Sequence, residues 1–346
     1  MIENKDFVLP KFVKMDNEYI DDLKVELNNY LSFIKGYVSE NCYQSISFVR
    51  ECISSCLKSY YDGDIDSASN YMCDIVDCIL KSDDDFISSI GKMKNDFILD
   101  NIVFKARCSA PDSQLMAEEM LHIPFDHREI VRGQRFSIPG CPCIYLGKTT
   151  YIDWLEMLQP SFNTFFVSPI EVDEKLKVFN LAQTNWMEIY GLANNNELDE
   201  LSKKSVMFPL ILATSYVVKD NNDRHFKSEY ILSQLLMSCM AKYKVSGIAY
   251  LSKRSDDYSI IYPINLCYAF LANDDTDKCF RVLNPVNMSI YLTMINKNHS
   301  DCNFRYPDEF AKRPIYINGE SQPYNETIFY EFDQYLKRKC RNENKR

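Results

Sequence analysis

The first eighty residues place apolar side chains at helical spacing, and this pattern constrains the fold more than any other feature of the chain. Three such stripes occur: Ile20, Leu23, Leu27, Leu31, Ile34 and Val38; Ile46, Val49, Ile53 and Leu57; and Met72, Ile75 and Ile79. Steps of three and four residues are typical of amphipathic helices. A turn at residues 61–64 precedes the third stripe, where Asp64 or Asp66 can cap the helix. Short connections favour antiparallel packing, so residues 1–95 are predicted to form a small helical bundle.

The predicted bundle is acidic, whereas the rest of the chain is nearly neutral. Residues 1–100 hold 19 acidic and 10 basic residues, and residues 101–346 hold 30 and 29. A scaffold or a partner-binding surface is the default role of the bundle. Without a basic face, nucleic-acid binding is not expected, and any anionic ligand must be held by locally placed arginines. The short basic C-terminal tail is interpreted as a solvated helix end.

The sequence predicts a cytoplasmic protein without a metal centre. Its N-terminus is charged where a signal peptide would be apolar, and no apolar run reaches the length of a membrane span. Thirteen cysteines without an export signal indicate reduced thiols. Cys141 and Cys143 form a CxC pair, but no second ligand pair has the spacing of a structural zinc site.

From residue 96 onward the pattern indicates a mixed α+β domain, predicted to span residues 96–346. Short strands are expected at 101–107, 143–146, 164–167, 176–181 and 247–251, with a hairpin or two more strands around Pro263 within 258–270. Helices are expected after Thr149 or Thr150 up to Pro160, at 225–243 and at 324–339. Strands and helices do not alternate regularly, which argues against a doubly wound sheet.

Several nucleotide-binding folds are disfavoured by what the sequence lacks. It contains no GxGxxG, GxxxxGK[ST], HExxH or GxSxG motif, and only 9 glycines in 346 residues. A glycine-rich phosphate cradle is therefore hard to build. A nucleotide would have to be bound by side chains.

Four local pieces carry chemically useful residues in a fixed order. They are Phe104–Arg107, the segment from Gln134 to Tyr145 with its Pro139-Gly140 turn, the helix bearing Glu156, and the strand 247–251 followed by Ser252 and a segment starting at Asn265. Each piece alone has an ordinary structural explanation. An arginine in a strand usually pairs with a carboxylate, and a serine after a strand usually forms a turn.

Together these pieces resemble the RES domain, a family named for its arginine, glutamate and serine. The arginine-aromatic element is Arg135-Phe136, the strand-end tyrosine is Tyr145, Glu156 follows that tyrosine by 11 residues, and Ser252 follows Tyr250 by two. The likeness covers roughly half of the chain. Gln134 separates Gly133 from the arginine, and the long segment between Arg107 and Arg135 is similar to that of a divergent subgroup.

The resemblance implies a fold and an activity. It implies a split, strongly bent mixed sheet like that of the ADP-ribosyltransferases, with NAD⁺ as substrate in its cleft. Cleavage of the nicotinamide–ribose bond would transfer ADP-ribose to water, to inorganic phosphate or to a protein. Many such proteins are toxins neutralised by an antitoxin, which could bind the N-terminal bundle, and a homodimer is possible.

The chemistry assigns a role to each matched residue. Glu156 is the expected catalytic carboxylate that stabilises an oxocarbenium-like ribose. Arg107 and Arg135 are expected to bind the pyrophosphate, because guanidinium groups pair with phosphate oxygens. Tyr145 would stack on a substrate ring, and Ser252 would hydrogen-bond the substrate or Glu156.

Three further residues and one other interpretation stay open. His122, His127 and Arg128 could line the same cleft, although a structural role is the more ordinary reading of each. The alternative to an enzyme is a catalytically inactive module whose acidic bundle recruits a partner. The four intact catalytic residue types argue mildly against that alternative.

Overall fold

The three amphipathic stripes form three long helices in the computed structural model, which describes residues 7–96, 100–219, 224–255, 262–295, 314–317 and 319–343. These are α1 (Glu18–Ile34), α2 (Glu40–Tyr61) and α3 (Ile65–Ser82). Asp64 caps α3 by accepting a hydrogen bond from the Ser67 backbone at 3.0 Å, as predicted. In α1 the buried face includes Tyr19, Tyr30 and Phe33, so aromatic side chains extend the predicted stripe.

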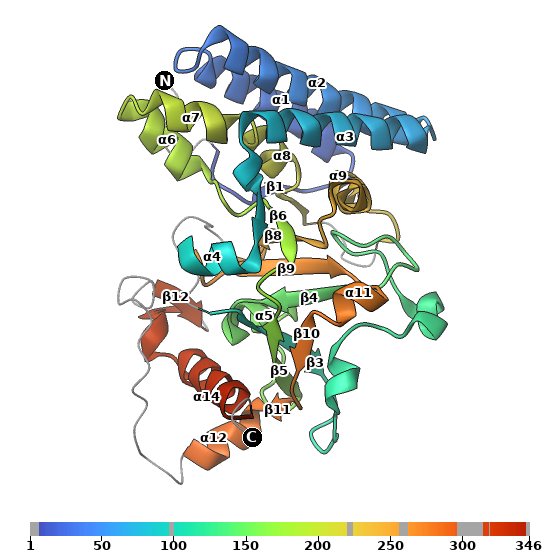
Figure 1. Cartoon of the computed structure of the whole chain (residues 1–346), viewed down its shortest axis with the longest axis vertical. Coiled ribbons are helices and arrows are strands. Elements are labelled where there is room, and N and C mark those ends of the chain that lie inside the picture. The colour runs from blue at the N-terminus through green and yellow to red at the C-terminus, as the bar shows by residue number, and fades with distance from the viewer. Residues whose placement is uncertain are drawn as a thin grey trace.

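These helices do not pack only on one another. In Figure 1 they lie at one end of the molecule beside α6 (Trp186–Asn194), α7 (Leu198–Ser205) and α8 (Phe208–Ala213), which come from far along the chain. Helices α2 and α3 also contact α9 (Ile231–Cys239). One continuous hydrophobic core includes residues from α1 to the C-terminal helix. The division into domains at residue 95 therefore stays a prediction.

A nine-stranded mixed sheet occupies the middle of the molecule. Its order is β10-β5-β3-β4-β9-β8-β6-β2, and β11 pairs with β5 beside β10. The strands are β2 (Ile87–Ser89), β3 (Ile102–Cys108), β4 (Cys143–Gly147), β5 (Phe165–Val172), β6 (Lys177–Asn180), β8 (Gly247–Leu251), β9 (Leu266–Leu271), β10 (Phe280–Val282) and β11 (Val286–Asn287). Strands β6 and β8 are parallel, whereas the other neighbours are antiparallel. The predicted α+β class is confirmed.

The sheet is split between β3 and β4. Strand β3 pairs with β5 along its whole length, and β4 pairs with β9 along its whole length. Between β3 and β4, however, the register contains a single pair, Phe104 opposite Gly147. The two strands therefore diverge beyond this point, and the residues from Lys105 onward face those before Gly147 across a gap. Side chains from both strands are free to line that gap.

Helix α5 (Thr150–Glu156) begins where the split closes. Thr149 caps it by accepting a hydrogen bond from the Ile152 backbone at 3.2 Å, which confirms one of the two predicted caps. The C-terminal helix α14 (Ile328–Glu343) packs against α5, and its Asp333 accepts a hydrogen bond from the Thr150 backbone at 2.9 Å. The hydroxyl of Tyr324 also donates to Asp333. The last helix thus supports the helix that carries Glu156.

Two smaller sheets and several short elements complete the described structure. They are β1 (Lys11–Val13) with β7 (Tyr216–Val218), β12 (Pro314–Ile317) with β13 (Glu320–Pro323), α4 (Ile90–Asp96), α11 (Asp274–Asp277) and α12 (Met288–Ile295). The 3-10 turns are η1 (Asp84–Phe86), η2 (Ala117–Met120), η3 (Phe125–Ile130), η4 (Ser228–Tyr230), η5 (Met240–Tyr243) and η6 (Tyr324–Glu326).

Some predicted boundaries were wrong. The helix expected at 225–243 is α9 flanked by the turns η4 and η5, so it is shorter and less regular. Within 258–270, β9 is confirmed, while residues 256–261 lie outside the described part. Each helix within the described ranges is too short or too polar to cross a membrane.

Candidate functional site

A cavity of about 550 Å³ opens at the split in the sheet. Its walls include Lys105 and Arg107 from β3, Tyr145 from β4 and Glu156 from α5. Residues 217–218 and 224–230 form a further wall, and the residues that follow β8 complete it. The volume lies within the range of roughly 300–1,000 Å³ that is usual for small-molecule sites.

Four of the five predicted site residues line this cavity, and the fifth, Ser252, bonds one of the four. Arg107, Arg135, Tyr145 and Glu156 line it. Ser252 is fully buried directly behind it, and its hydroxyl donates a hydrogen bond to the Glu156 carboxylate. The backbone N–H of Arg254 in turn donates to the Ser252 hydroxyl at 3.1 Å. Ser252, from the last of the four predicted segments, therefore holds the carboxylate of Glu156 in one orientation. The catalytic and binding roles of these residues stay predictions.

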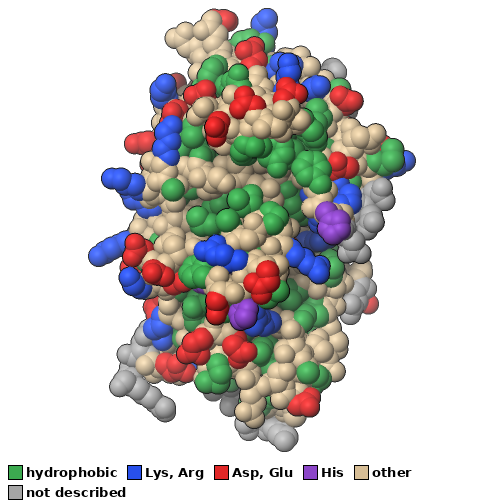
Figure 2. Space-filling view, turned by 90° about the vertical axis from the view of Figure 1, so that its right-hand side faces the viewer, with side chains coloured by type: hydrophobic (Ala, Val, Ile, Leu, Met, Phe, Trp, Pro, Cys, Tyr) green, Lys and Arg blue, Asp and Glu red, His purple; other side chains and the backbone are tan. Residues whose placement is uncertain are grey.

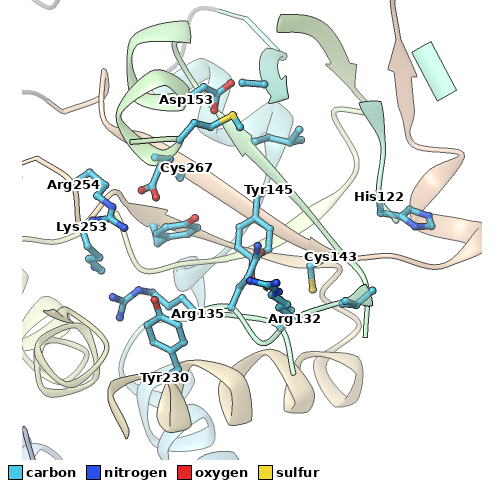
Figure 3. A pocket seen from close by; sticks show the side chains of 18 of the residues that line it. His122, Arg132, Arg135, Cys143, Tyr145, Asp153, Tyr230, Lys253, Arg254 and Cys267 are labelled. Atoms are coloured by element: carbon cyan, nitrogen blue, oxygen red, sulfur yellow. Dashed lines mark hydrogen bonds between the residues drawn. The ribbon is translucent and has the colours of Figure 1, made fainter. Parts of the chain in front are cut away.

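Tyr145 presents its ring, rather than its hydroxyl, to the cavity. The hydroxyl accepts a hydrogen bond from the Phe136 backbone at 3.1 Å and lies 3.0 Å from the Ser137 hydroxyl. Burial raises the pKa of this phenol well above its ordinary value. Tyr145 lies in the middle of the close-up in Figure 3, with Lys253 and Arg254 on one side and His122 on the other. An aromatic face in this position suits stacking of a planar ring.

Positive charge is concentrated around the cavity. Eight lysine and arginine side chains line it, against three carboxylates, Asp153, Glu156 and Glu229. The eight are Lys105, Arg107, Arg132, Arg135, Arg224, Lys227, Lys253 and Arg254. On the face shown in Figure 2, lysine and arginine side chains are scattered among acidic ones. This local excess of positive charge favours a small anionic ligand. Residues 101–346 are nearly neutral as a whole, so such a ligand was expected to be held by locally placed arginines.

The two predicted phosphate-binding arginines differ in their surroundings. Arg135 donates to the backbone carbonyls of Thr214 and Tyr216, at 3.0 and 2.9 Å, and its guanidinium lies 4.9 Å from the ring centroid of Tyr230. The guanidinium of Arg107 makes no hydrogen bond or ion pair within the described ranges. Arg107 is thus available to a ligand, whereas much of the donor capacity of Arg135 is used by the fold.

Two other available arginines were not predicted from the sequence. The guanidinium groups of Arg132 and Arg254 also line the cavity and have no polar partner in the portion of the chain described. Arg132 lies three residues before Arg135, and Arg254 lies two residues after Ser252. Their closeness in sequence to the motifs could have indicated them. Only the tertiary contacts, however, show which arginines are hydrogen-bonded within the fold and which remain available to a ligand.

Two buried ionisable residues beside Glu156 were also missed. Asp153 lies one helical turn before Glu156, and burial raises its pKa, although Lys105 opposes the shift. Burial and the nearby Arg135 lower the pKa of Lys253, which donates to the Ser215 hydroxyl at 2.8 Å. Perturbed ionisable groups within a cavity are typical of functional sites.

The three residues whose role was left open have structural partners. His122 lines the cavity, but its ring bonds Asp277 at 2.9 Å and the Ile123 carbonyl at 2.7 Å. Arg128 donates to the Gly140 carbonyl at 2.8 Å, and His127 is exposed beside Glu129. Neither His127 nor Arg128 lines the cavity. Among the described residues, Asp83, Asp84 and Asp85 are a group whose carboxylates lie close enough together to share one ion, and Cys141 and Cys143 are not part of it.

Comparisons with known proteins give one relative by sequence. No protein-family model matches the chain. A Bacillus subtilis (strain 168) protein named "Putative toxin YopC" is 28% identical over 240 residues, which cover 63% of this chain and 52% of the relative. The chain thus spans about half the length of that curated relative.

One solved structure overlaps the chain weakly. The crystal structure of the M. tuberculosis MbcT-MbcA toxin-antitoxin complex covers 62% of this chain and 95% of the matched chain, with 11% identity and a TM-score of 0.33. That score is too low to establish a common fold.

Proposed function

We propose that this protein is a toxin that binds NAD⁺ in the cavity and breaks the bond between nicotinamide and ribose. The observation that carries the proposal is the position of Glu156. Its carboxylate is oriented by Ser252 and opens onto the same cavity as the available arginines Arg107, Arg132 and Arg254. For cleavage of a dinucleotide, this combination supplies a carboxylate for the reacting ribose and cations for the pyrophosphate.

The proposed chemistry uses these groups as follows. When the bond from ribose C1′ to the pyridine nitrogen breaks, its electron pair stays on the nitrogen, so nicotinamide leaves as a neutral molecule. The positive charge that develops on the ribose is stabilised by the Glu156 carboxylate. An acceptor oxygen then bonds to C1′. Water releases a proton in this step, whereas inorganic phosphate bonds through an unprotonated oxygen and releases none. The acceptor is water or inorganic phosphate.

The toxic role rests on different support. The relative with 28% identity is named a toxin, and this name motivates a test in cells. We further propose that a neutralising protein binds the acidic N-terminal helices, since this surface complements a basic partner.

Nicotinamide release from NAD⁺ tests the proposal directly. Purified protein should release nicotinamide. A rate that rises with added phosphate identifies phosphate as the acceptor, and a rate that does not depend on phosphate identifies water. Glu156→Ala should release none and should be tolerated when expressed in cells. If wild-type protein releases no nicotinamide with or without phosphate, and Glu156→Ala is as toxic as wild type, the proposal fails. Label from NAD⁺ retained on a single protein of a cell extract would instead indicate transfer to a protein.

A further inference from the structure

One wall of the cavity is held in place by the N-terminal residues. This wall, residues 214–219 and 224–230, contributes Val217, Val218, Arg224, Lys227 and Tyr230 to the cavity lining. Its strand β7 pairs with β1 and with no other strand of the described structure. Two further backbone hydrogen bonds extend the pairing, from Lys11 to Ser215 at 3.0 Å and from Lys219 to Val13 at 2.9 Å.

Asp16 fastens the second half of the same wall. Its carboxylate accepts hydrogen bonds from the Ser228 backbone at 3.1 Å and from the Ser228 hydroxyl, and it forms an ion pair with Arg224. Arg224 also bonds Glu229 at 2.9 Å. From α2, the Tyr61 hydroxyl donates to the Ser228 hydroxyl at 2.8 Å. Asp16 therefore joins the connection between β1 and α1 to the turn that carries Lys227 and Tyr230.

A second route leads from α1 to Arg135. The Tyr216 hydroxyl donates to Asp22 at 2.8 Å, and the Tyr216 carbonyl accepts from Arg135. The Tyr19 hydroxyl donates to the Ala213 carbonyl at 3.1 Å, at the start of the wall. Through these contacts the helical region, expected to be a scaffold or a partner-binding surface, holds the wall that carries cationic groups of the cavity.

We propose that Asp16 is a positioning residue for ligand binding, which acts by fixing Arg224 and Ser228 and with them the wall at 224–230. The inference rests on the proposed function for its kinetic readout. Glu156 and Ser252 belong to α5 and to the end of β8, which Asp16 does not contact. Loss of the Asp16 carboxylate should therefore raise KM for NAD⁺ and leave kcat nearly unchanged.

Full-length Asp16→Asn tests this inference with two measurements. We expect KM for NAD⁺ to rise roughly tenfold, as for the loss of a charged hydrogen bond, with kcat within about twofold of wild type. Hydrogen exchange of the amides in residues 214–219 and 224–230 should speed up, while exchange in α14 stays the same. Asp21→Asn is the matched control, because Asp21 is exposed on α1 and forms an ion pair with Lys24 of the same helix at 3.8 Å. Ser228→Ala serves as a second variant if Asp16→Asn does not fold.

The outcomes separate this inference from the proposed function. Unchanged KM, a fall in kcat alone, or faster exchange throughout the chain would overturn the positioning role of Asp16. If wild type releases no nicotinamide, the proposed function fails, but the exchange measurement still decides whether Asp16 holds the wall. Unchanged exchange at 214–219 and 224–230 would then refute the inference by itself.

Discussion

The hydroxyl of Ser252 donates a hydrogen bond to the carboxylate of Glu156, although 96 residues separate them along the chain. The serine follows β8 and the glutamate ends α5, so the contact exists only when the sheet and the helix are packed together. It places a carboxylate of fixed orientation at the edge of a cation-lined cavity.

Glu156→Gln should lower kcat for nicotinamide release by about 10²–10³, because a preorganised charge next to the developing cation is lost. Ser252→Ala should lower kcat less, by roughly tenfold, since the carboxylate is kept but its orientation is not. Single-turnover kinetics with NAD⁺ measures both effects. Glu51→Gln, on the exposed side of α2, is the control. A Ser252→Ala variant with wild-type kcat would argue against a catalytic role for this hydrogen bond.

Arg107→Gln and Arg254→Gln should each raise KM for NAD⁺ by about tenfold or more, because each guanidinium is free to pair with phosphate oxygens. The KM of wild type should also rise with salt concentration, and less steeply in each variant. Arg50→Gln is a matched control, since Arg50 bonds Asn28 in the helical region far from the cavity. If KM for NAD⁺ rose with salt equally steeply in wild type and in the variants, phosphate binding by these arginines would be contradicted.

Asp333 should make the protein less stable as pH rises from about 4 to 6. Burial raises the pKa of its carboxyl to about 6, although Lys337 opposes the shift. The folded state thus holds a proton that the unfolded chain releases near pH 4. The resulting stability is fully present below pH 4 and is lost as pH rises through 6, on the order of 3 kcal/mol. Urea unfolding of wild type and Asp333→Asn at several pH values measures it, because other titrations cancel in the difference. A difference that does not change with pH would exclude this role.

Gly147→Ala should destabilise the protein by about 1–3 kcal/mol and also reduce activity. A methyl group at Gly147 would lie 2.4 Å from Asp153 Oδ1 and 2.6 Å from Ile152 Cγ2, so α5 would have to move away from β4. That movement displaces Glu156. Gly191→Ala in α6 is the control, because a methyl group there meets no atom within 4 Å. Thermal unfolding and nicotinamide release measure the two effects, and equal results for the two alanine variants would refute the argument.

The sequence predicted best those features that depend on local spacing. Helices α1 to α3 and the caps at Asp64 and Thr149 follow from periodicity and from short-range hydrogen bonds. The short strand β1 was not predicted, because three residues pairing with a strand about two hundred positions later leave no local signal. For the same reason the contribution of the N-terminal residues to the cavity wall could not be read from their composition.

Within the site, the sequence indicated which segments meet at the cavity. It did not indicate which side chains would be hydrogen-bonded or have shifted pKa values. Arg132 and Arg135 are three residues apart, yet only Arg135 meets the carbonyls of Thr214 and Tyr216. Asp153 and Lys253 look like ordinary charged residues in the sequence, and their pKa values shift only through burial and through charges that the fold brings near them. Whether a side chain has a bonding partner, and how far it is removed from water, is determined by the packing of the whole chain and not by the neighbouring sequence.

The single paired position between β3 and β4 has a consequence for how activity is acquired. Since Phe104 and Gly147 close the split that the cavity occupies, the halves of the sheet on either side must both be formed before a ligand has two walls to bind. Contacts between distant parts of a chain slow folding, because the entropy of closing long loops is lost before the contacts stabilise the chain. Under the proposed function, a newly synthesised molecule would be harmless while only one half has folded. Toxicity would then begin with the final assembly of the sheet rather than with synthesis.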